Sequence, residues 1–362
     1  MPVVETVTWD QILAWRMGRQ FLAPAVAGGP AYVTGRLAGV QAQVASAAKL
    51  TIALRQTELC ADSDAVEIAL DVRTLVKTWA MRGTLHLLPA DEAAAYLELS
   101  AAHRNWERGS WQRSFGATPA DLETIAAAAA EALAGGAVLT REELTAEIVD
   151  RTGSAHLAGV LGSGWGTLLK PLAWWRVLCF GPPSGGRVTF TSAAWLPPVP
   201  DPAGTVLRAF LGAYGPATPE LFDKVWLSRG NTPKAVLRSW FAALEGELAE
   251  VEVEGERRVM LAAHLDELLA TGPSTAVRLL GPFDAYVLGG GTTAAEIVPP
   301  ERRKEVSRAG GWISPVVLRG GRVVGVWGKE GVTLWDDVPA SAVEAEMSRH
   351  ERLRLLLGGS GP

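Results

Sequence analysis

The segment LTREEL, residues 139–144, opens a helix and begins the pattern that indicates the fold. Thr140 is a residue type that caps helices, and Glu143, three positions later, completes a capping box. A second helical segment follows over residues 166–175. The runs VLCF (177–180) and RVTFT (187–191) favour strands, and a Gly/Pro-rich turn separates them. This part of the chain therefore predicts two helices followed by a β-hairpin.

The same pattern recurs on both sides of this segment. Downstream, Thr218-Pro219 and Thr232-Pro233 each indicate a capped helix start with proline at the first helical position. Two strand-like runs, 248–253 and 258–261, then flank a turn at Gly255. Upstream, helical segments at 9–21 and 32–54 precede a hairpin whose strands, 75–79 and 84–88, flank Met81-Arg82-Gly83.

Helices followed by a two-stranded wing are typical of winged helix-turn-helix units. We therefore expect an α+β, mainly helical protein built from three tandem winged helix-turn-helix units with β-hairpin wings. The expected units are residues 1–117, 118–200 and 201–362. The proline-rich segment LPPVPDP, residues 196–202, marks the second boundary.

Composition excludes several classes of protein. The chain has 362 residues, enough for two or three domains, and its 48% apolar and 20% charged residues are normal for a soluble globular protein. No apolar run is long enough to cross a bilayer, and the N-terminus does not resemble a secretory signal. Cys60, Cys179 and the five histidines are scattered, without the spacing of a disulfide framework or metal site. We expect a cytoplasmic monomer with no metal and no cofactor.

Charge is unevenly distributed along the chain. The net charge of −5 argues mildly against a nucleic-acid partner, but residues 302–322 carry six basic side chains and one acid. The run VVLRGGRVVGVW (316–327) predicts a hairpin with a Gly-Gly turn. Its flanking arginines either form a solvated tip or enter a groove and contact phosphates. The expected DNA-binding residues in this region are Arg302, Arg303, Lys304, Arg319 and Arg322.

Five phrases, in this order along nearly the whole chain, resemble the AlkZ/YcaQ family. They are QAQ (41–43), MRGTLHL (81–87), YGPAT (214–218), LGPFDAY (280–286) and GGWISP (310–315). The resemblance implies three winged-helix units curved around DNA and hydrolysis of the N-glycosidic bond of N7-alkylated purines. Some members unhook interstrand crosslinks made by azinomycin-type natural products. Members carry either glutamine or aspartate at the position of Gln43, and glutamine resembles the crosslink-unhooking, self-resistance branch.

The resemblance implies that Gln41 and Gln43 are catalytic and that the partner is double-stranded DNA with alkylated or crosslinked purines. Two neutral amides suit this reaction because an N7-alkylguanine is already cationic and needs no general acid to depart. A glutamine carbonyl can orient a water molecule, and an amide dipole can support developing positive charge. On an ideal helix, residues two apart point about 200° away from each other. We therefore expect the motif at a helix end or irregular joint, with Ala42 packed inward.

Further residues of these phrases are candidates for the site. Arg82, at the tip of the predicted hairpin, is expected to bind a phosphate. His86 and Thr84 are candidates for supporting the cleft, although a buried structural histidine is the more common situation. Trp106 and Trp111, which lie among arginines, are candidates for an exposed aromatic and basic strip.

Two other functions are compatible with the sequence. Winged helices most often serve in transcriptional regulators, so a DNA-binding regulator without catalysis is the main alternative. Against it, no segment after a turn is dense in Arg, Lys, Asn and Gln, as a recognition helix would be. The second alternative is a protein that protects against a genotoxin by binding it directly.

Overall fold

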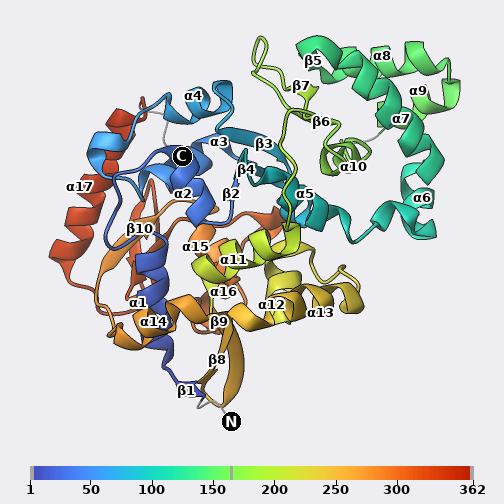
Figure 1. The fold of residues 1–362 in the computed structure, drawn as a ribbon. Helices are drawn as coiled ribbons and strands as arrows, with labels where there is room; N and C mark the ends of the chain where they lie inside the picture. The colour runs from blue at the N-terminus through green and yellow to red at the C-terminus, as the bar shows by residue number, and fades with distance from the viewer. Residues whose placement is uncertain (1–3, 164–165, 359–362) are drawn as a thin grey trace.

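The computed structural model describes residues 4–163 and 166–358 (Figure 1). The fold is mixed α+β and rich in helices, with short sheets set among them, as the sequence predicts. The first part of the chain contains three helices and a three-stranded sheet of order β2-β4-β3. Its elements are α2 (Pro30–Arg36), β2 (Val40–Gln41), α3 (Ala45–Ala53), α4 (Ala65–Asp71), β3 (Leu75–Trp79) and β4 (Leu85–Pro89).

The same order of elements occurs a second time. A helix leads into the first strand, further helices follow, and a hairpin closes a sheet of order β5-β7-β6. The capping box predicted at Thr140 is present, with Glu143 as its partner. The elements are α7 (Pro119–Ala132), β5 (Leu139–Thr140), α8 (Arg141–Thr152), α9 (Ala155–Ser163), α10 (Leu169–Trp174), β6 (Leu178–Phe180) and β7 (Thr189–Ser192).

A third occurrence follows, and an isolated bridge between Ala217 and Val259 takes the place of its first strand. Thr218 caps a short helix as predicted, but Thr232 does not, because its hydroxyl bonds to Ser228 and the next helix begins after Pro233. The elements are α11 (Pro202–Tyr214), α12 (Pro219–Leu221), the π-helix η5 (Phe222–Leu227), α13 (Lys234–Ala243), β8 (Leu248–Val253) and β9 (Glu256–Leu261).

The N-terminal segment, which the sequence places in a first unit of residues 1–117, makes its contacts with the third occurrence. Strand β1 (Glu5–Thr6) pairs in parallel with β8, and α1 (Trp9–Arg19) lies against α14 (Leu265–Ala270). The physical reason is the apolar face of α1, because Ile12 and Trp15 are buried in one cluster with Val251 and Met260.

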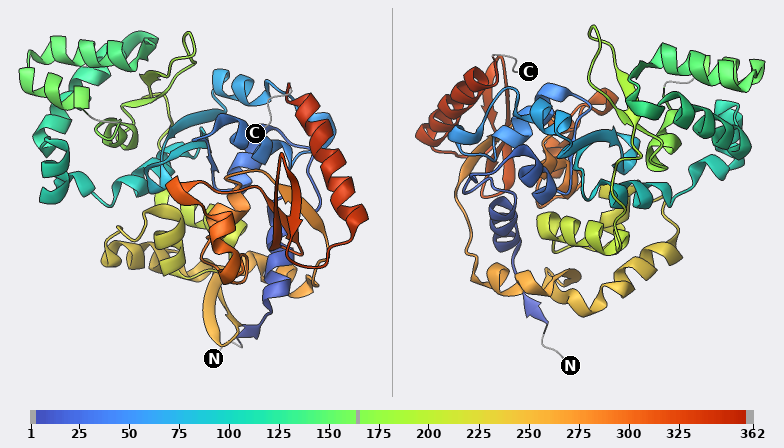
Figure 2. Two further views of the ribbon diagram at one scale, coloured as in Figure 1. Left: turned by 180° about the vertical axis from the view of Figure 1, so that it is seen from behind. Right: turned by 45° about the horizontal axis from the view of Figure 1, so that its top comes forward.

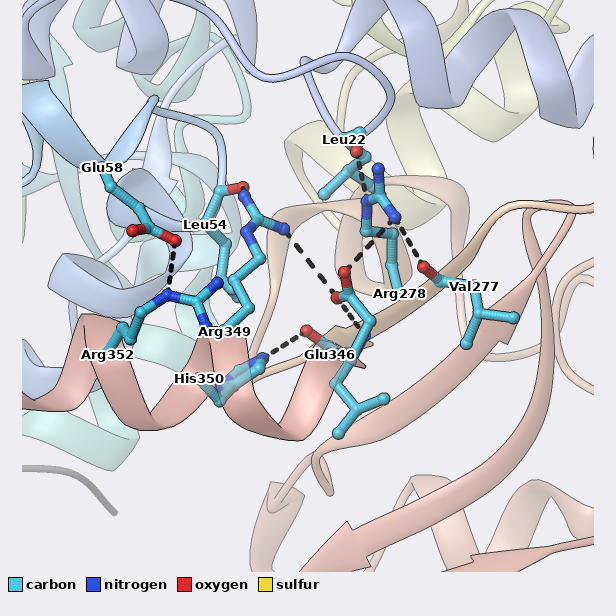
Figure 3. Close-up of polar contacts among 10 residues, drawn as sticks. Leu22, Leu54, Glu58, Val277, Arg278, Glu346, Arg349, His350 and Arg352 are labelled. Atoms are coloured by element: carbon cyan, nitrogen blue, oxygen red, sulfur yellow. Dashed lines mark hydrogen bonds and ion pairs between the residues drawn. The ribbon is translucent and has the colours of Figure 1, made fainter. Parts of the chain in front are cut away.

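The last part of the chain forms a four-stranded antiparallel sheet of order β10-β11-β12-β13. Helix α17 (Ala340–Leu356) packs on it: Glu346 bonds to Arg278, and His350 bonds to the carbonyl of Leu279 (Figure 3). Arg349 of the same helix donates to Leu54 O, which ties this part to the end of α3. The remaining elements are β10 (Val277–Leu280), α15 (Ala285–Gly290), α16 (Arg303–Val306), β11 (Val316–Arg319), β12 (Arg322–Gly328) and β13 (Gly331–Leu334).

The second occurrence and α17 lie at opposite ends of the molecule, as both views of Figure 2 show. Two connecting helices, α5 (Ala93–Ala101) and α6 (Gly109–Phe115), lead from the first occurrence to the second. The largest core cluster runs continuously from Ala38 through α5, α7 and α10 to α11 and α13. The three occurrences therefore share one continuous core and are packed against one another.

Candidate active site

The QAQ motif lies at a joint between a strand and a helix. Gln41 ends β2, and α3 begins four residues later, at Ala45. The backbone remains extended through Ala42, whose N–H donates to Leu85 O, and extended chain places alternate side chains on one face. Ala42 is buried, Gln41 is half-buried and Gln43 is exposed. The structure thus confirms the expected irregular joint and the inward packing of Ala42.

Arg82 holds the side chain of Gln41. Its Nη2 donates to Gln41 Oε1 over 3.1 Å, and its Nη1 donates to Trp226 O over 2.8 Å. A guanidinium has no acceptor, so Gln41 must turn its oxygen toward Arg82 and its amide nitrogen away. Among the described residues, no hydrogen bond or ion pair engages Gln41 Nε2 or the side chain of Gln43.

The carbonyls that receive Arg82 come from the last turn of η5, where carbonyl groups lack partners within the helix. Arg82 is not a free tip, because its guanidinium is bonded to these carbonyls and to Gln41, and its expected contact with a phosphate stays a prediction. Its backbone has a φ of 57°, a conformation that costs energy for any residue with a side chain. Burial lowers the pKa of Arg82 to about 10, so it remains charged near neutral pH.

His86 lies beside Gln41 but does not face solvent. The two residues are directly opposite in the β2–β4 ladder, so their side chains share one face of the sheet. His86 is 1% exposed, and its Nδ1 lies 3.0 Å from Thr84 O, which requires a proton on that nitrogen. Burial, with a further effect of Arg82, lowers the pKa of His86 to about 3. His86 is therefore a neutral group beneath the motif, and not the residue lining an open cleft that the sequence suggested.

Thr84 also has a structural partner. Its hydroxyl donates to Met81 O across the hairpin turn over 3.2 Å. This bond stabilises the turn that carries Arg82, so Thr84 acts on the site through the backbone of that turn.

The predicted hairpin around the Gly-Gly turn is present, but the turn is not a projecting tip. Gly321 is buried, its carbonyl accepts from Tyr286 Oη, and a Cβ there would lie 2.7 Å from Leu13 Cβ. Arg322 pairs with Asp10, and Arg319 donates to Asp337 O. Both arginines therefore have partners within the protein because the turn packs on α1, and their expected role in DNA binding stays a prediction.

The remaining basic candidates differ among themselves. Arg302 pairs with Glu305 and lies over the ring of Trp335. Arg303 and Lys304 are exposed, and within the described part of the chain no hydrogen bond or ion pair engages them. A role for these three residues in DNA binding stays a prediction.

No local signal in the sequence predicted the contribution of η5. The carbonyls of Val225 and Trp226 come from residues more than 140 positions away from Arg82, and backbone groups leave no pattern in a sequence. In the described ranges, no group of three or more His, Cys, Asp or Glu side chains is placed to hold a metal ion. None of the helices in those ranges is long and apolar enough to span a membrane.

Comparison with known proteins gives consistent results. Residues 34–345 match the family described as "DNA glycosylase AlkZ-like". The chain is 49% identical over 328 residues to a Streptomyces sahachiroi protein named "Interstrand DNA cross-link repair glycosylase", covering 88% of this chain and 87% of that protein. A solved structure, the "Streptomyces sahachiroi DNA glycosylase AlkZ", superimposes with a TM-score of 0.90 at 44% identity. The match covers 98% of this chain and 97% of that one.

Proposed function

The chain belongs to the AlkZ-like family of DNA glycosylases, and from this premise we propose that it hydrolyses the N-glycosidic bond of N7-alkylated purines in duplex DNA, interstrand crosslinks included. The observation that carries the proposal is the pair of glutamines at the β2–α3 joint, one held by Arg82 and one exposed. The motif Gln41-Ala42-Gln43 itself carries no carboxylate, which suits a leaving group that already carries positive charge.

We assign different roles to the two glutamines. Gln43 is exposed, so its carbonyl accepts a hydrogen bond from the attacking water and directs that water at the anomeric carbon. Gln41 gives its oxygen to Arg82 and retains two N–H donors for a sugar oxygen or for the carbonyl of Gln43. Because hydrogen bonds in a chain polarise one another, the charge of Arg82 makes the Gln41 amide a stronger donor.

The three occurrences of one element order are, in this proposal, three winged helix-turn-helix units. Each sheet places the first strand next to the last, with the strand that follows the helices at the far side: β2-β4-β3, β5-β7-β6 and the Ala217 bridge with β9 and β8. We propose that they surround duplex DNA as a monomer and that the Gln41–Gln43 joint faces the damaged strand. Arg303 and Lys304 remain candidates for phosphate contacts.

Crosslinked purines fit an exposed motif. A base tethered to both strands cannot rotate fully out of the duplex, so a deep pocket for an extruded base would exclude it. Gln43 is exposed at the surface and reaches a lesion that stays within the helix. We propose that the enzyme serves in resistance to a genotoxic natural product that alkylates purine N7.

The test compares cationic and neutral leaving groups. The protein is incubated with duplexes that contain N7-methylguanine, a nitrogen-mustard crosslink between guanine N7 atoms, or uracil, and alkali-labile abasic sites are measured. Abasic sites at both N7-alkylated substrates and none at uracil are expected. Excision of uracil at a comparable rate would refute the mechanism, and failure on both alkylated substrates would refute the proposed activity.

A further inference from the structure

A polar cavity lies next to the proposed active site, where the three occurrences of the element order meet. Its volume is about 270 Å³. The hairpin turn of the first occurrence contributes Arg82 and Gly83, α10 of the second contributes Lys170 and Trp174, and the segment after η5 contributes Arg229. Each of the three repeats thus supplies one cationic side chain to the same wall.

The ionisable side chains that line this cavity are basic, and the nearby carboxylate of Asp223 lies behind the lining, where it accepts from the hydroxyl of Ser228. The lining holds Arg82, Lys170 and Arg229 and includes no aspartate or glutamate among the described residues. Three other cavities of the described chain each contain acidic and basic side chains together, as at Arg104 and Glu107 or at Lys49 and Glu67. Lys170 is half-buried and Arg229 is exposed, so both cations can be reached by an anionic ligand from solution.

Lys170 and Arg229, the two cations other than Arg82, have unoccupied donors within the described part of the chain. Among the described residues, no hydrogen bond or ion pair engages the side chain of Lys170 or Arg229. The indole N–H of Trp174 is also buried without an acceptor. Burial, followed by the charge of Arg229, lowers the pKa of Lys170, which means that the two cations repel each other across the cavity. The donors present are those that a phosphate oxygen accepts from.

Arg82 joins this cavity to the active site. Lys170 Nζ reaches the turn that carries Arg82, since a Cβ on Gly83 would lie 3.5 Å from it. The Nη2 of Arg82 bonds to Gln41 Oε1. A ligand in the cavity is therefore separated from Gln41 by a single guanidinium group.

We propose that this cavity binds one backbone phosphodiester of the DNA beside the damaged nucleotide, with Lys170 and Arg229 as its ligands, an inference that rests on the proposed function. The phosphate sets the position of the lesion relative to Gln41, because Arg82 forms part of both sites. Trp106 was expected on an exposed strip but is buried, and together with Trp111 it forms the apolar side of this cavity.

The test is a thermodynamic cycle that measures DNA affinity while one protein side chain and one DNA phosphate are changed, separately and together. Duplexes carry one N7-methylguanine on a 2′-fluoro sugar, which retains the base, and one neutral methylphosphonate linkage that is moved stepwise around the lesion. We expect wild-type protein to lose about tenfold in affinity at one linkage. The Lys170→Gln and Arg229→Gln variants bind the unmodified duplex about tenfold more weakly and lose nothing further at that linkage.

Salt dependence gives a second measurement of the same contact. Loss of one phosphate contact lowers the slope of log K against log salt by about 0.9. Arg354→Gln is the matched control, because Arg354 is exposed on α17 at the opposite end of the molecule, and we expect it to behave as wild type. Lys170→Arg keeps the charge and is expected to restore the coupling, which separates a lost contact from a fold that has been disturbed.

If the Lys170 and Arg229 variants lose as much affinity as wild type when the methylphosphonate is placed at the sensitive linkage, the phosphate site is overturned. Stabilisation of the wild-type protein by inorganic phosphate alone, with no sensitive linkage in DNA, would also overturn it. Binding to the 2′-fluoro duplex does not require base release. If the variants and the sensitive linkage are coupled but ordinary N7-methylguanine is not excised, the proposed function is contradicted and the cavity assignment stands. If N7-methylguanine is excised but no such coupling is found, the cavity assignment is contradicted and the proposed function stands.

Discussion

The joint between the first strand and the following helix differs between the first and second repeats. In the second, β5 ends at Thr140 and α8 begins at once, with Thr140 and Glu143 bonded reciprocally in a capping box. In the first, three residues intervene between Gln41 and α3, and the capping position is Val44, which makes no side-chain bond to the helix. The same place in the fold stabilises a helix in one repeat and presents two glutamines in the other.

The difference indicates how much stability the first repeat gives up at the joint that carries the two glutamines. A side-chain cap contributes about 1 kcal/mol to stability, and the first repeat does without it. The hairpin turns also differ, and again the strain lies in the first repeat. Arg82 has a strained backbone and is bonded inward, whereas Arg187, beside the turn of the second hairpin, is exposed. Functional sites commonly accept such local losses because the surrounding packing sustains them.

The largest effect is expected from the glutamines themselves. Gln43→Ala and Gln41→Ala should each lower the single-turnover rate of N7-methylguanine excision by about 100-fold, since each removes one oriented group from the transition state. DNA affinity should change little. Thr140→Ala, at the corresponding joint of the second repeat, is the matched control for rate. Unchanged rates in both glutamine variants would contradict their assignment.

A smaller loss, about tenfold, is expected for Arg82→Lys. Lysine keeps the charge but cannot donate in a fork to Gln41 and the η5 carbonyls together. The excision rate should fall with little change in DNA affinity. Arg187→Lys makes the same substitution in the other hairpin and should leave the rate unaltered, and an equal loss in both variants would show that Arg82 has no special connection with Gln41.

Thr140→Ala should have the opposite effect to the glutamine variants, because it should lower stability and leave the excision rate unchanged. Loss of its capping box should lower the free energy of unfolding by about 1 kcal/mol, measured by urea denaturation, while excision remains at the wild-type rate. A large loss of activity without loss of stability would mean that the second joint, like the first, takes part in the reaction.

The smallest effect is expected from pH. The pKa of His86 is lowered to about 3 and that of Arg82 to about 10, so neither residue changes protonation between about pH 5 and pH 9. The single-turnover rate should be nearly constant over this interval. Stability is a separate matter: a histidine with a lowered pKa favours the fold above its unfolded pKa of 6.5, and this contribution is lost as pH falls toward 3. A bell-shaped rate profile centred near pH 7 would point to an acid or base not yet identified.

Local patterns predicted the repeats and the nature of the motif's backbone. Capping residues, strand-like runs and Gly or Pro turns act over a few positions, so the hairpins and the helix start at Thr140 could be recognised directly. The argument from helix geometry also placed the QAQ motif correctly, because two polar residues around one buried alanine require extended chain.

Contacts between segments far apart in the chain determine the features that local sequence patterns did not predict. The partners of Arg82 in η5, the pairing of β1 with β8, and the burial of the Gly320–Gly321 turn against α1 all join residues far apart in the chain. Arg82, Arg319 and Arg322 look alike in the sequence, as arginines at hairpin turns. Only the tertiary fold determines that Arg82 contacts Gln41, whereas Arg319 and Arg322 bond to Asp337 and Asp10.

The ion pair between Arg55 and Asp284 limits how the chain can be shortened. Both side chains are fully buried, and two hydrogen bonds join them, from the end of α3 to the residue that caps α15. A protein ending before the C-terminal sheet would keep Arg55 inside without its counter-charge, which is strongly destabilising. The C-terminal part of the chain is thus not a detachable appendage, because the helix that follows the QAQ motif relies on it for the counter-charge of Arg55.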